Sequence, residues 1–199
     1  DILTFSVDDA ANATVSVDGN ILTIAPFENY NGPLSITVSV NDGLESDSTP
    51  FVVTVNPVND APVLDVIDDQ NIDEDTSLLL TLSADDIDAG DVLTYSAGVT
   101  GNATVDVSGD QLTVAPDPNF NGDIQVTVFV SDGDLADSQT FRLTVNPVND
   151  PPTIDGVSDK EMDEDTVLEV ALFGDDIDVE DELTFSVDDT DNATVSVDG

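Results

Sequence analysis

The stretch IQVTVFV at residues 124–130 carries an apolar side chain at every second position. Ile124, Val126, Val128 and Val130 alternate mostly with polar residues. Successive side chains of a β-strand point to opposite faces, so this period of two predicts a strand with one buried face. Further alternating runs occur at residues 78–82, 93–95, 103–107, 112–114 and 141–145. With turn residues between them and no helical periodicity, these runs predict an all-β sandwich of about seven strands.

The sequence repeats itself after 90 residues without a gap. Residues 1–60 and 91–150 are identical at 32 of 60 positions, and both contain the motif NPVND, at 56–60 and at 146–150. Proline and turn residues interrupt the strand-like runs there, so we interpret NPVND as a linker. A repeat of domain size predicts tandem domains joined end to end.

The linkers define the expected domains. We expect residues 1–60 to be the C-terminal part of a first repeat, 61–150 a complete repeat, and 151–199 the N-terminal part of a third. Residues 181–199 match residues 1–19 at 16 of 19 positions. This match fits a window cut from a longer array.

The charge of the chain restricts its partners. The 199 residues include 44 Asp and Glu but only two cations, Arg142 and Lys160, which gives a net charge of −42. Such a charge excludes nucleic acid as a partner and disfavours anionic membranes. No apolar run is long enough to insert into a bilayer. Because self-repulsion of this size opposes a compact fold, we expect inorganic cations to bind.

The residue types present also argue against an enzyme. The chain has no His, no Cys and a single Lys, so most nucleophile and general-base mechanisms lack their groups. Two carboxylates would suffice for a glycoside hydrolase. However, the acidic clusters recur in each repeat, and no inserted loop is present to build a cleft. The sequence therefore predicts a protein without catalytic residues.

The acidic motifs ADDIDAGD (84–91) and GDDIDVED (174–181) lie 90 residues apart. An antiparallel sandwich reverses direction at each turn, so its turns sort to two ends. At one end of the 61–150 repeat, beside the preceding linker, we expect Asn59, Asp60, Asp86, Asp88, Asp91 and Asp132. At the other end we expect Glu74, Asn149, Asp150, Asp176, Asp178 and Asp181, with Asp117 and Asn119 as further candidates.

Calcium suits such a set of ligands. It takes six to eight oxygen ligands in a flexible geometry, whereas magnesium prefers a tight octahedron and retains water. Zinc and copper prefer imidazole or thiolate, and the chain has neither. We therefore predict Ca²⁺ at each junction between repeats. The alternative interpretation is a solvated acidic surface without a bound ion.

These residues resemble a known family. Glu74 in DEDT, Asp86 and Asp88 in DDIDAGD, Asp132 in SDG, and PVND before proline resemble the calcium-binding motifs of cadherin repeats, in the same order. The resemblance covers the whole chain and is closest to bacterial cadherin-like tandem repeats of very large secreted adhesins and biofilm proteins. It departs from the animal linker, because Ala61 and Pro151 replace its second asparagine.

The resemblance implies tandem Ig-like or cadherin-like sandwiches of seven strands in a Greek-key arrangement. It also implies one to three Ca²⁺ per junction and adds Asp42 and Glu164, the counterparts of Asp132 and Glu74, as ligands. The implied function is a calcium-rigidified extender or adhesive array of a large bacterial protein, extracellular and in a marine or high-calcium setting. Such an array would mediate cell adhesion or biofilm attachment, with neighbouring repeats of the same chain as partners. Two alternatives stay open: a filament subunit that binds copies of itself, and a polysaccharide-binding module.

Overall fold

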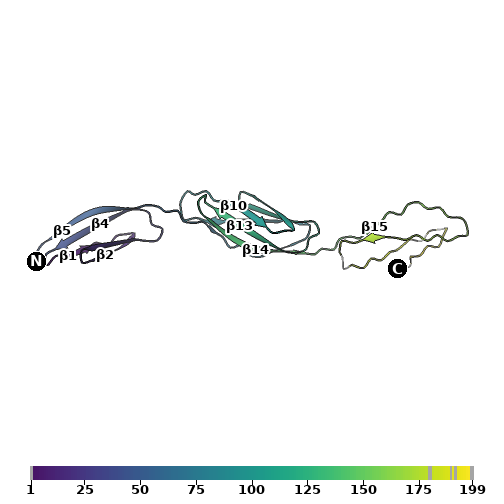
Figure 1. The fold of residues 1–199 in the computed structure, drawn as a ribbon, viewed down its shortest axis with the longest axis horizontal. Coiled ribbons are helices and arrows are strands. Elements are labelled where there is room, and N and C mark those ends of the chain that lie inside the picture. The colour runs from purple at the N-terminus through teal and green to yellow at the C-terminus, as the bar shows by residue number, and fades with distance from the viewer. Residues whose placement is uncertain (1, 179–180, 189, 191, 198–199) are drawn as a thin grey trace. The chain divides into compact units, whose positions relative to one another are not determined.

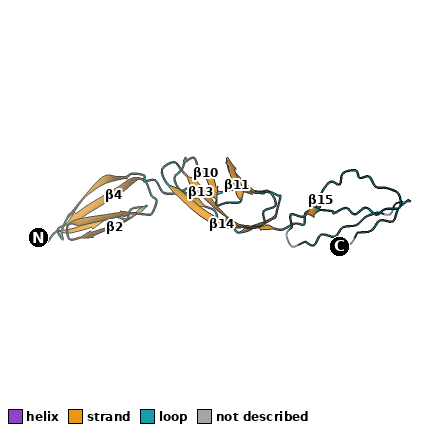
Figure 2. Ribbon diagram, turned by 45° about the vertical axis from the view of Figure 1, so that its right-hand side comes forward, coloured by secondary structure: helices purple, strands orange, loops and turns teal. Residues whose placement is uncertain are grey.

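The computed structural model describes residues 2–178, 181–188, 190 and 192–197, which contain sixteen strands and no helix (Figure 2). Within these ranges no helix is long and apolar enough to span a bilayer. By their contacts the residues group into two compact units. Unit 1 comprises Asp1–Asp65, Ser83–Tyr95 and Phe129–Ser138, and unit 2 comprises Val66–Leu82, Ser96–Val128 and Gln139–Gly199.

Residues 1–60, the first repeat, contain five strands. They are β1 (Thr4–Val7), β2 (Ala13–Asp18), β3 (Ile21–Pro26), β4 (Gly32–Asn41) and β5 (Ser46–Val55). One sheet has the order β1-β4-β5, with β4 and β5 side by side (Figure 1), and β2 and β3 form an antiparallel hairpin. Gly19 supplies the positive φ of 61° that the tight hairpin turn requires. Ala13, Leu34 and Ile36 form the buried core of this repeat.

Residues 61–150, the middle repeat, contain nine strand segments. They are β6 (Val63–Leu64), β7 (Gln70–Asp73), β8 (Leu78–Thr81), β9 (Ala84–Asp85), β10 (Thr94–Val99), β11 (Ala103–Ser108), β12 (Gln111–Pro116), β13 (Gly122–Ser131) and β14 (Ala136–Asn146). The sheets have the orders β10-β13-β14-β7, β11-β12-β8 and β6-β9. The chain crosses between the two larger sheets from β8 to β10, from β10 to β11 and from β12 to β13, as in a Greek-key β-sandwich. The all-β sandwich expected from the sequence is confirmed.

The first strand of the middle repeat is divided into two segments, β6 and β7. β6 pairs with β9 antiparallel, whereas β7 pairs with β14 in parallel. Between them the chain changes sheets, and Gln139 accepts a hydrogen bond from the Ile67 amide at 3.2 Å. If β6 and β7 are counted as one strand, and β8 and β9 as another, the nine segments correspond to seven strands.

The core of the middle repeat follows the period of two. Val126, Val128 and Val130 of β13 are fully buried, as are Leu112 and Val114 of β12. Burial of these apolar side chains is the main favourable term for the fold. The alternating pattern of the sequence therefore correctly predicts which face of β12 and of β13 is buried.

Residues 151–199, the third repeat, contain only β15 (Thr153–Ile154) and β16 (Gly174–Asp175) as strands among the residues described. These two pair in the register of β6 and β9 shifted by 90 residues. No residue that the structure describes in this repeat is buried. The boundaries 1–60, 61–150 and 151–199 stay predictions.

Replacement of Leu112 by alanine should lower the free energy of unfolding of the middle repeat by about 2–5 kcal/mol, because it leaves a cavity in a packed core. Leu79 on the neighbouring strand is 67% exposed, and its replacement by alanine should change that free energy by no more than about 0.5 kcal/mol. Urea titration followed by circular dichroism measures both. Equal losses for the two variants would contradict the assigned burial.

Candidate metal centres at the ends of the repeats

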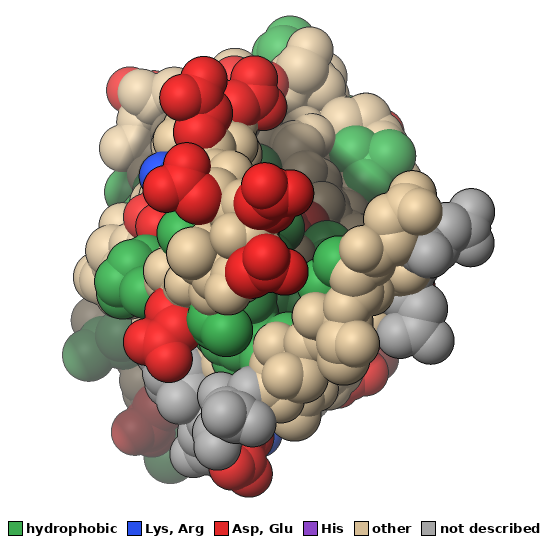
Figure 3. All heavy atoms as spheres, turned by 90° about the vertical axis from the view of Figure 1, so that its right-hand side faces the viewer, with side chains coloured by type: hydrophobic (Ala, Val, Ile, Leu, Met, Phe, Trp, Pro, Cys, Tyr) green, Lys and Arg blue, Asp and Glu red, His purple; other side chains and the backbone are tan. Residues whose placement is uncertain are grey.

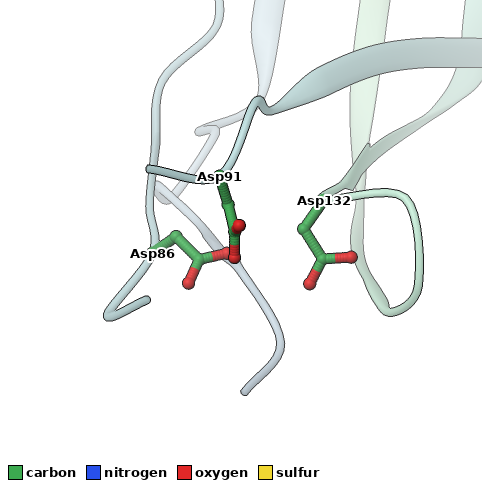
Figure 4. Close-up of side chains that lie close together, drawn as sticks. All are labelled: Asp86, Asp91 and Asp132. Atoms are coloured by element: carbon green, nitrogen blue, oxygen red, sulfur yellow. The ribbon is translucent and has the colours of Figure 1, made fainter. Parts of the chain in front are cut away.

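Three aspartates meet at one end of the middle repeat. Asp86 follows β9, Asp91 precedes β10, and Asp132 follows β13, and one carboxylate oxygen from each lies within 4.8 Å of the others. Figure 4 shows their side chains on neighbouring segments around a shared space. Calcium binds oxygens at about 2.3–2.6 Å, so oxygens up to about 5 Å apart can share one ion. The spacing of this three-aspartate cluster therefore fits calcium.

The turn after β13 orients Asp132. Its Oδ1 accepts hydrogen bonds from the backbone amides of Asp134 and Leu135, both at 2.7 Å, and Oδ2 accepts one from Asn59 Nδ2 at 2.8 Å. The Leu135 amide and then the Asn59 side chain lower the pKa of Asp132. Asp132 is thus held ionised and in a fixed direction.

One carboxylate oxygen of Asp86 indicates that the cluster binds a cation. Its Oδ1 accepts a hydrogen bond from the Asp88 amide at 2.9 Å, but its Oδ2 is buried and has no hydrogen-bond partner. A buried carboxylate oxygen without a donor is costly and rare in folded proteins. A cation in the cluster would satisfy it, so the residues present fit a bound metal ion.

Asp91 shows the opposite electrostatic effect from Asp132. Desolvation and then the charges of Asp86, Asp88, Asp132 and Asp134 raise the pKa of Asp91. Arg142 pairs with Asp69 and Asp123, and among the described residues no salt bridge reaches the carboxylates of this cluster. The cluster is therefore repulsive until a cation enters it.

The linker before the middle repeat is tied to this cluster within unit 1. The backbone amide of Asp60 donates to Asp88 Oδ2 at 2.7 Å, and Asn59 Nδ2 donates to Asp132. Asp88 thus binds the linker backbone and lies outside the group of three. The carboxylate of Asp60 also lies outside that group. The roles of Asn59, Asp60 and Asp88 as metal ligands stay predictions.

A second cluster lies 90 residues later, within unit 2, and it includes Asp178, the counterpart of Asp88, as its third member. Oxygens of Asp176, Asp178 and Asp181 lie within 4.8 Å of one another. The Asp150 amide donates to Asp178 Oδ2 at 2.7 Å, and the Asp178 amide donates to Asp176 Oδ1 at 3.0 Å. The linker contact is therefore the same as in unit 1. Asn149 Nδ2 bonds the carbonyl of Asp150 at 2.7 Å and contacts neither group of carboxylates in a recorded hydrogen bond.

Further carboxylates surround Asp150, in the linker that follows the middle repeat. Desolvation and then the charges of Asp75, Asp178, Glu74 and Asp176 raise the pKa of Asp150. Glu74 is only 4% exposed, and its Oε1 accepts a hydrogen bond from the Val148 amide at 2.6 Å. Glu74 thus anchors the following linker as well as contributing charge.

Asp75 was not among the metal ligands predicted from the sequence. Its φ is 59°, and its Oδ1 accepts a hydrogen bond from the Asn119 amide at 3.0 Å. With its side-chain nitrogen turned toward the carboxylates, Asn119 also donates to Asp150 Oδ2 at 3.2 Å and to Asp75 Oδ2 at 3.3 Å. The recurrence of DEDT at 163–166 was the available signal, since both copies carry the second aspartate.

Three other candidates lie outside the clusters. Asp42 Oδ1 accepts hydrogen bonds from the amides of Glu45 and Leu44, and these lower its pKa. Neither Asp42 nor Glu164 belongs to a group of three carboxylates within the described part of the chain. Asp117 bonds Asn102 through its backbone amide, and its carboxylate joins neither group. Ligation by these residues stays a prediction.

The surface of the protein shows the excess of acidic over basic residues that the sequence contains. On the face drawn in Figure 3, red carboxylate side chains are prominent and blue cationic ones are scarce. Lys160 donates to Ser158 Oγ at 3.1 Å, and no salt bridge of Lys160 is recorded among the described residues. Most carboxylates therefore depend on counter-ions from solution.

In calcium-free buffer, Asp91→Asn should stabilise the middle repeat at pH 7. The folded protein raises the pKa of Asp91 above 3.8, so the charged form is disfavoured in the folded state at neutral pH. The gain should shrink as the pH falls through the raised pKa toward 3.8 and should vanish below it. Urea unfolding with a chelator at several pH values measures this. Asp106→Asn, which changes an exposed side chain of β11, is the control, and an equal gain there would contradict the cause.

Comparisons with known proteins agree with the fold. Residues 59–145 match the sequence profile of the bacterial Ig domain family. The chain is 33% identical over 148 residues to chitinase A of Pseudoalteromonas piscicida, a match that covers 73% of this chain but only 17% of that protein.

Two solved structures illustrate the structural neighbours. Human protocadherin-24 EC1-2 has a TM-score of 0.51 and 18% identity, over 75% of this chain and 83% of that one. An endo-fucoidan hydrolase of glycoside hydrolase family 107, MfFcnA4, has a TM-score of 0.34 and 19% identity, over 73% of this chain and 23% of that one. Residues 59–145 are thus similar in sequence to a bacterial Ig domain, and the fold is similar to that of cadherin repeats.

Proposed function

We propose that the chain is a calcium-rigidified segment of an extracellular bacterial repeat array. The observation that carries this proposal is the cluster of Asp86, Asp91 and Asp132, whose oxygens lie within 4.8 Å and include a buried, unpartnered Asp86 Oδ2. The linker is hydrogen-bonded to the same end of the repeat through Asn59 and Asp60. An ion in this cluster would therefore stiffen the linker.

Each residue has a distinct part in this mechanism. Asp86, Asp91 and Asp132 supply carboxylate oxygens to the ion, which removes the repulsion among them. Asp88 and Asn59 hold the linker against the same loops, so calcium binding and linker order are coupled. In unit 2, Asp176, Asp178 and Asp181 would act in the same way, and Asp150 and Asp75 would add charge from the preceding repeat.

The expected affinity is sufficient for such a role. Extracellular calcium modules bind with dissociation constants of about 10⁻⁴–10⁻³ M. At a calcium concentration ten times the dissociation constant, one site stabilises the ordered state by about 1.4 kcal/mol. This is enough to shift a linker from mostly mobile to mostly ordered.

The array would serve as a non-catalytic extender or adhesive segment of a large cell-surface or secreted protein, with a role in cell adhesion or biofilm attachment. The bacterial Ig domain and the cadherin-like fold support this class of function. The recurrence of the acidic loops in both clusters also supports it, because an active site would be expected once rather than in every repeat.

Asp86→Asn should weaken calcium binding at the first cluster at least tenfold, because it removes the negative charge of the carboxylate that contains the buried oxygen Oδ2. Calcium titration calorimetry measures the affinity, and small-angle scattering with calcium and then chelator measures the maximum dimension. We expect the wild-type protein to lengthen with calcium and the variant to lengthen less. Asp106→Asn is the matched control, because the Asp106 side chain is exposed and lies outside both clusters. Unchanged heat and shape in the wild type would overturn the proposal.

A second candidate function is favoured by the similarity to chitinase A. The chain would then be an accessory segment that positions or anchors a separate polysaccharide-acting domain. In this case the repeats would bind an insoluble polysaccharide themselves, or act only as spacers.

Sedimentation of the purified chain with chitin, and separately with cellulose, distinguishes these possibilities. Depletion from the supernatant by chitin alone would support a carbohydrate-binding module. If the chain stays in the supernatant with both polymers while calcium still alters its shape, it does not bind these polysaccharides. That result would contradict polysaccharide binding and support the spacer role.

A further inference from the structure

The triplet Asn-Ala-Thr occurs at residues 12–14, 102–104 and 192–194. It matches the sequon Asn-X-Ser/Thr, in which an asparagine accepts an N-linked sugar and X is any residue but proline. No other asparagine of the sequence has Ser or Thr two positions later. Every sequon of the chain therefore lies at the same place in the 90-residue register.

The asparagine side chain of this triplet is free in both of the first two repeats. Asn12 lies in the turn before β2 and Asn102 in the turn between β10 and β11, and both are exposed. Among the described residues, no hydrogen bond of either side-chain amide is recorded. The two amide groups are thus available to another molecule.

The backbone of the same asparagine is held by the fold. The carbonyl of Asn12 accepts a hydrogen bond from the Phe27 amide at 2.9 Å, and the carbonyl of Asn102 accepts one from the Asp117 amide at 2.8 Å. Positions 27 and 117 correspond after a shift of 90 residues. Each repeat therefore fixes the main chain of the asparagine and leaves its side chain unused.

The conformation of the turn does not explain the repeated asparagine. In the middle repeat Gly101 and Asn102 have φ values of 66° and 54°, a region that asparagine adopts more readily than most residues. In the first repeat neither Ala11 nor Asn12 has a positive φ. The turn thus differs between the two repeats, whereas the triplet is the same.

The other two positions of the triplet have different environments. Ala13 is 5% exposed and belongs to the core of the first repeat, so its small apolar side chain has a packing role. Thr14 and Thr104 are exposed on β2 and β11, and no hydrogen bond of their hydroxyls is recorded among the described residues. The two residues that define a sequon are therefore the two whose polar groups face solvent.

The turn also has room for a bulky substituent. A Cβ atom built on Gly101 would meet no heavy atom within 4 Å, and Ala11 at the equivalent position is exposed. An N-linked sugar is bulky and needs such a surface position. Both turns satisfy this requirement.

We propose that Asn12 and Asn102 are acceptor sites for N-linked sugars, with Asn192 as the third copy of the same sequon. The donor is a sugar activated by a diphosphate, and a separate glycosyltransferase catalyses the transfer. The asparagine Nδ2 bonds to the anomeric carbon, and the bond from that carbon to the diphosphate breaks. The diphosphate leaves with the bonding electrons, and one Nδ2 proton passes to a base of the transferase.

Mass spectrometry of the protein isolated from the cells that produce it tests the proposal. A protease that cleaves beside acidic residues releases the peptides, which are weighed before and after a peptide-N-glycosidase acts in heavy-oxygen water. We expect sugar masses on the peptides of Asn12 and Asn102, and heavy-oxygen aspartate at both positions after treatment. Asn121 is the internal control, because it is exposed but has Asp123 two positions later. Unmodified Asn12 and Asn102, or equal labelling of Asn121, would overturn the proposal.

Substitutions at Thr104 separate an acceptor site from a turn residue, because they leave Asn102 in place. Expressed in the same cells, Thr104→Val should lower the sugar occupancy of Asn102 at least tenfold, whereas Thr104→Ser should change it less than twofold. Asn12 in the same molecules is the matched control and should keep its occupancy. Circular dichroism checks that both variants fold. Unchanged occupancy of Asn102 in Thr104→Val would show that the triplet is not read as a sequon.

This inference goes beyond the calcium mechanism and uses none of its residues. Calcium titration of the protein before and after removal of the sugars keeps the two apart, because Asp86, Asp91 and Asp132 are unchanged by that treatment. A protein without sugars that still binds calcium would overturn this inference alone. A glycosylated protein without a calcium response would overturn only the proposed function.

Discussion

Repulsion among carboxylates at the ends of the repeats is the constraint on which the rest of this structure depends. Within one cluster the protein holds Asp132 ionised through backbone donors, while the neighbouring charges raise the pKa of Asp91. The buried Asp86 Oδ2 has no donor. Such an arrangement is unfavourable alone and favourable around a hard cation. The linker is hydrogen-bonded to the same loops through Asn59 and Asp60.

The three repeats share one design. In the middle repeat the strands are paired and the core is closed. The same 90-residue register relates all three. The acidic ends and the packed sheets are therefore separate features of the middle repeat.

The sequence was a good guide to the site only where residues follow strand ends. The alternation of strand direction was enough to expect Asp86, Asp91 and Asp132 at one end, where the structure places them. It did not show that Asp88 would bind the Asp60 amide. Asp75 was missed, because its proximity to Asp150 depends on the path of the chain through a turn rather than on any local pattern.

By itself the sequence determined the all-β class, the 90-residue register and the buried face of each main strand, because period-two patterning and self-similarity are local properties of the chain. Only the tertiary structure decided that the first strand of the middle repeat divides between two sheets, and which oxygen of Asp86 is left without a donor. Those features depend on contacts between distant residues, such as Asn59 with Asp132, 73 positions apart. Local patterns do not encode such pairings, because they arise only when the sheets pack together.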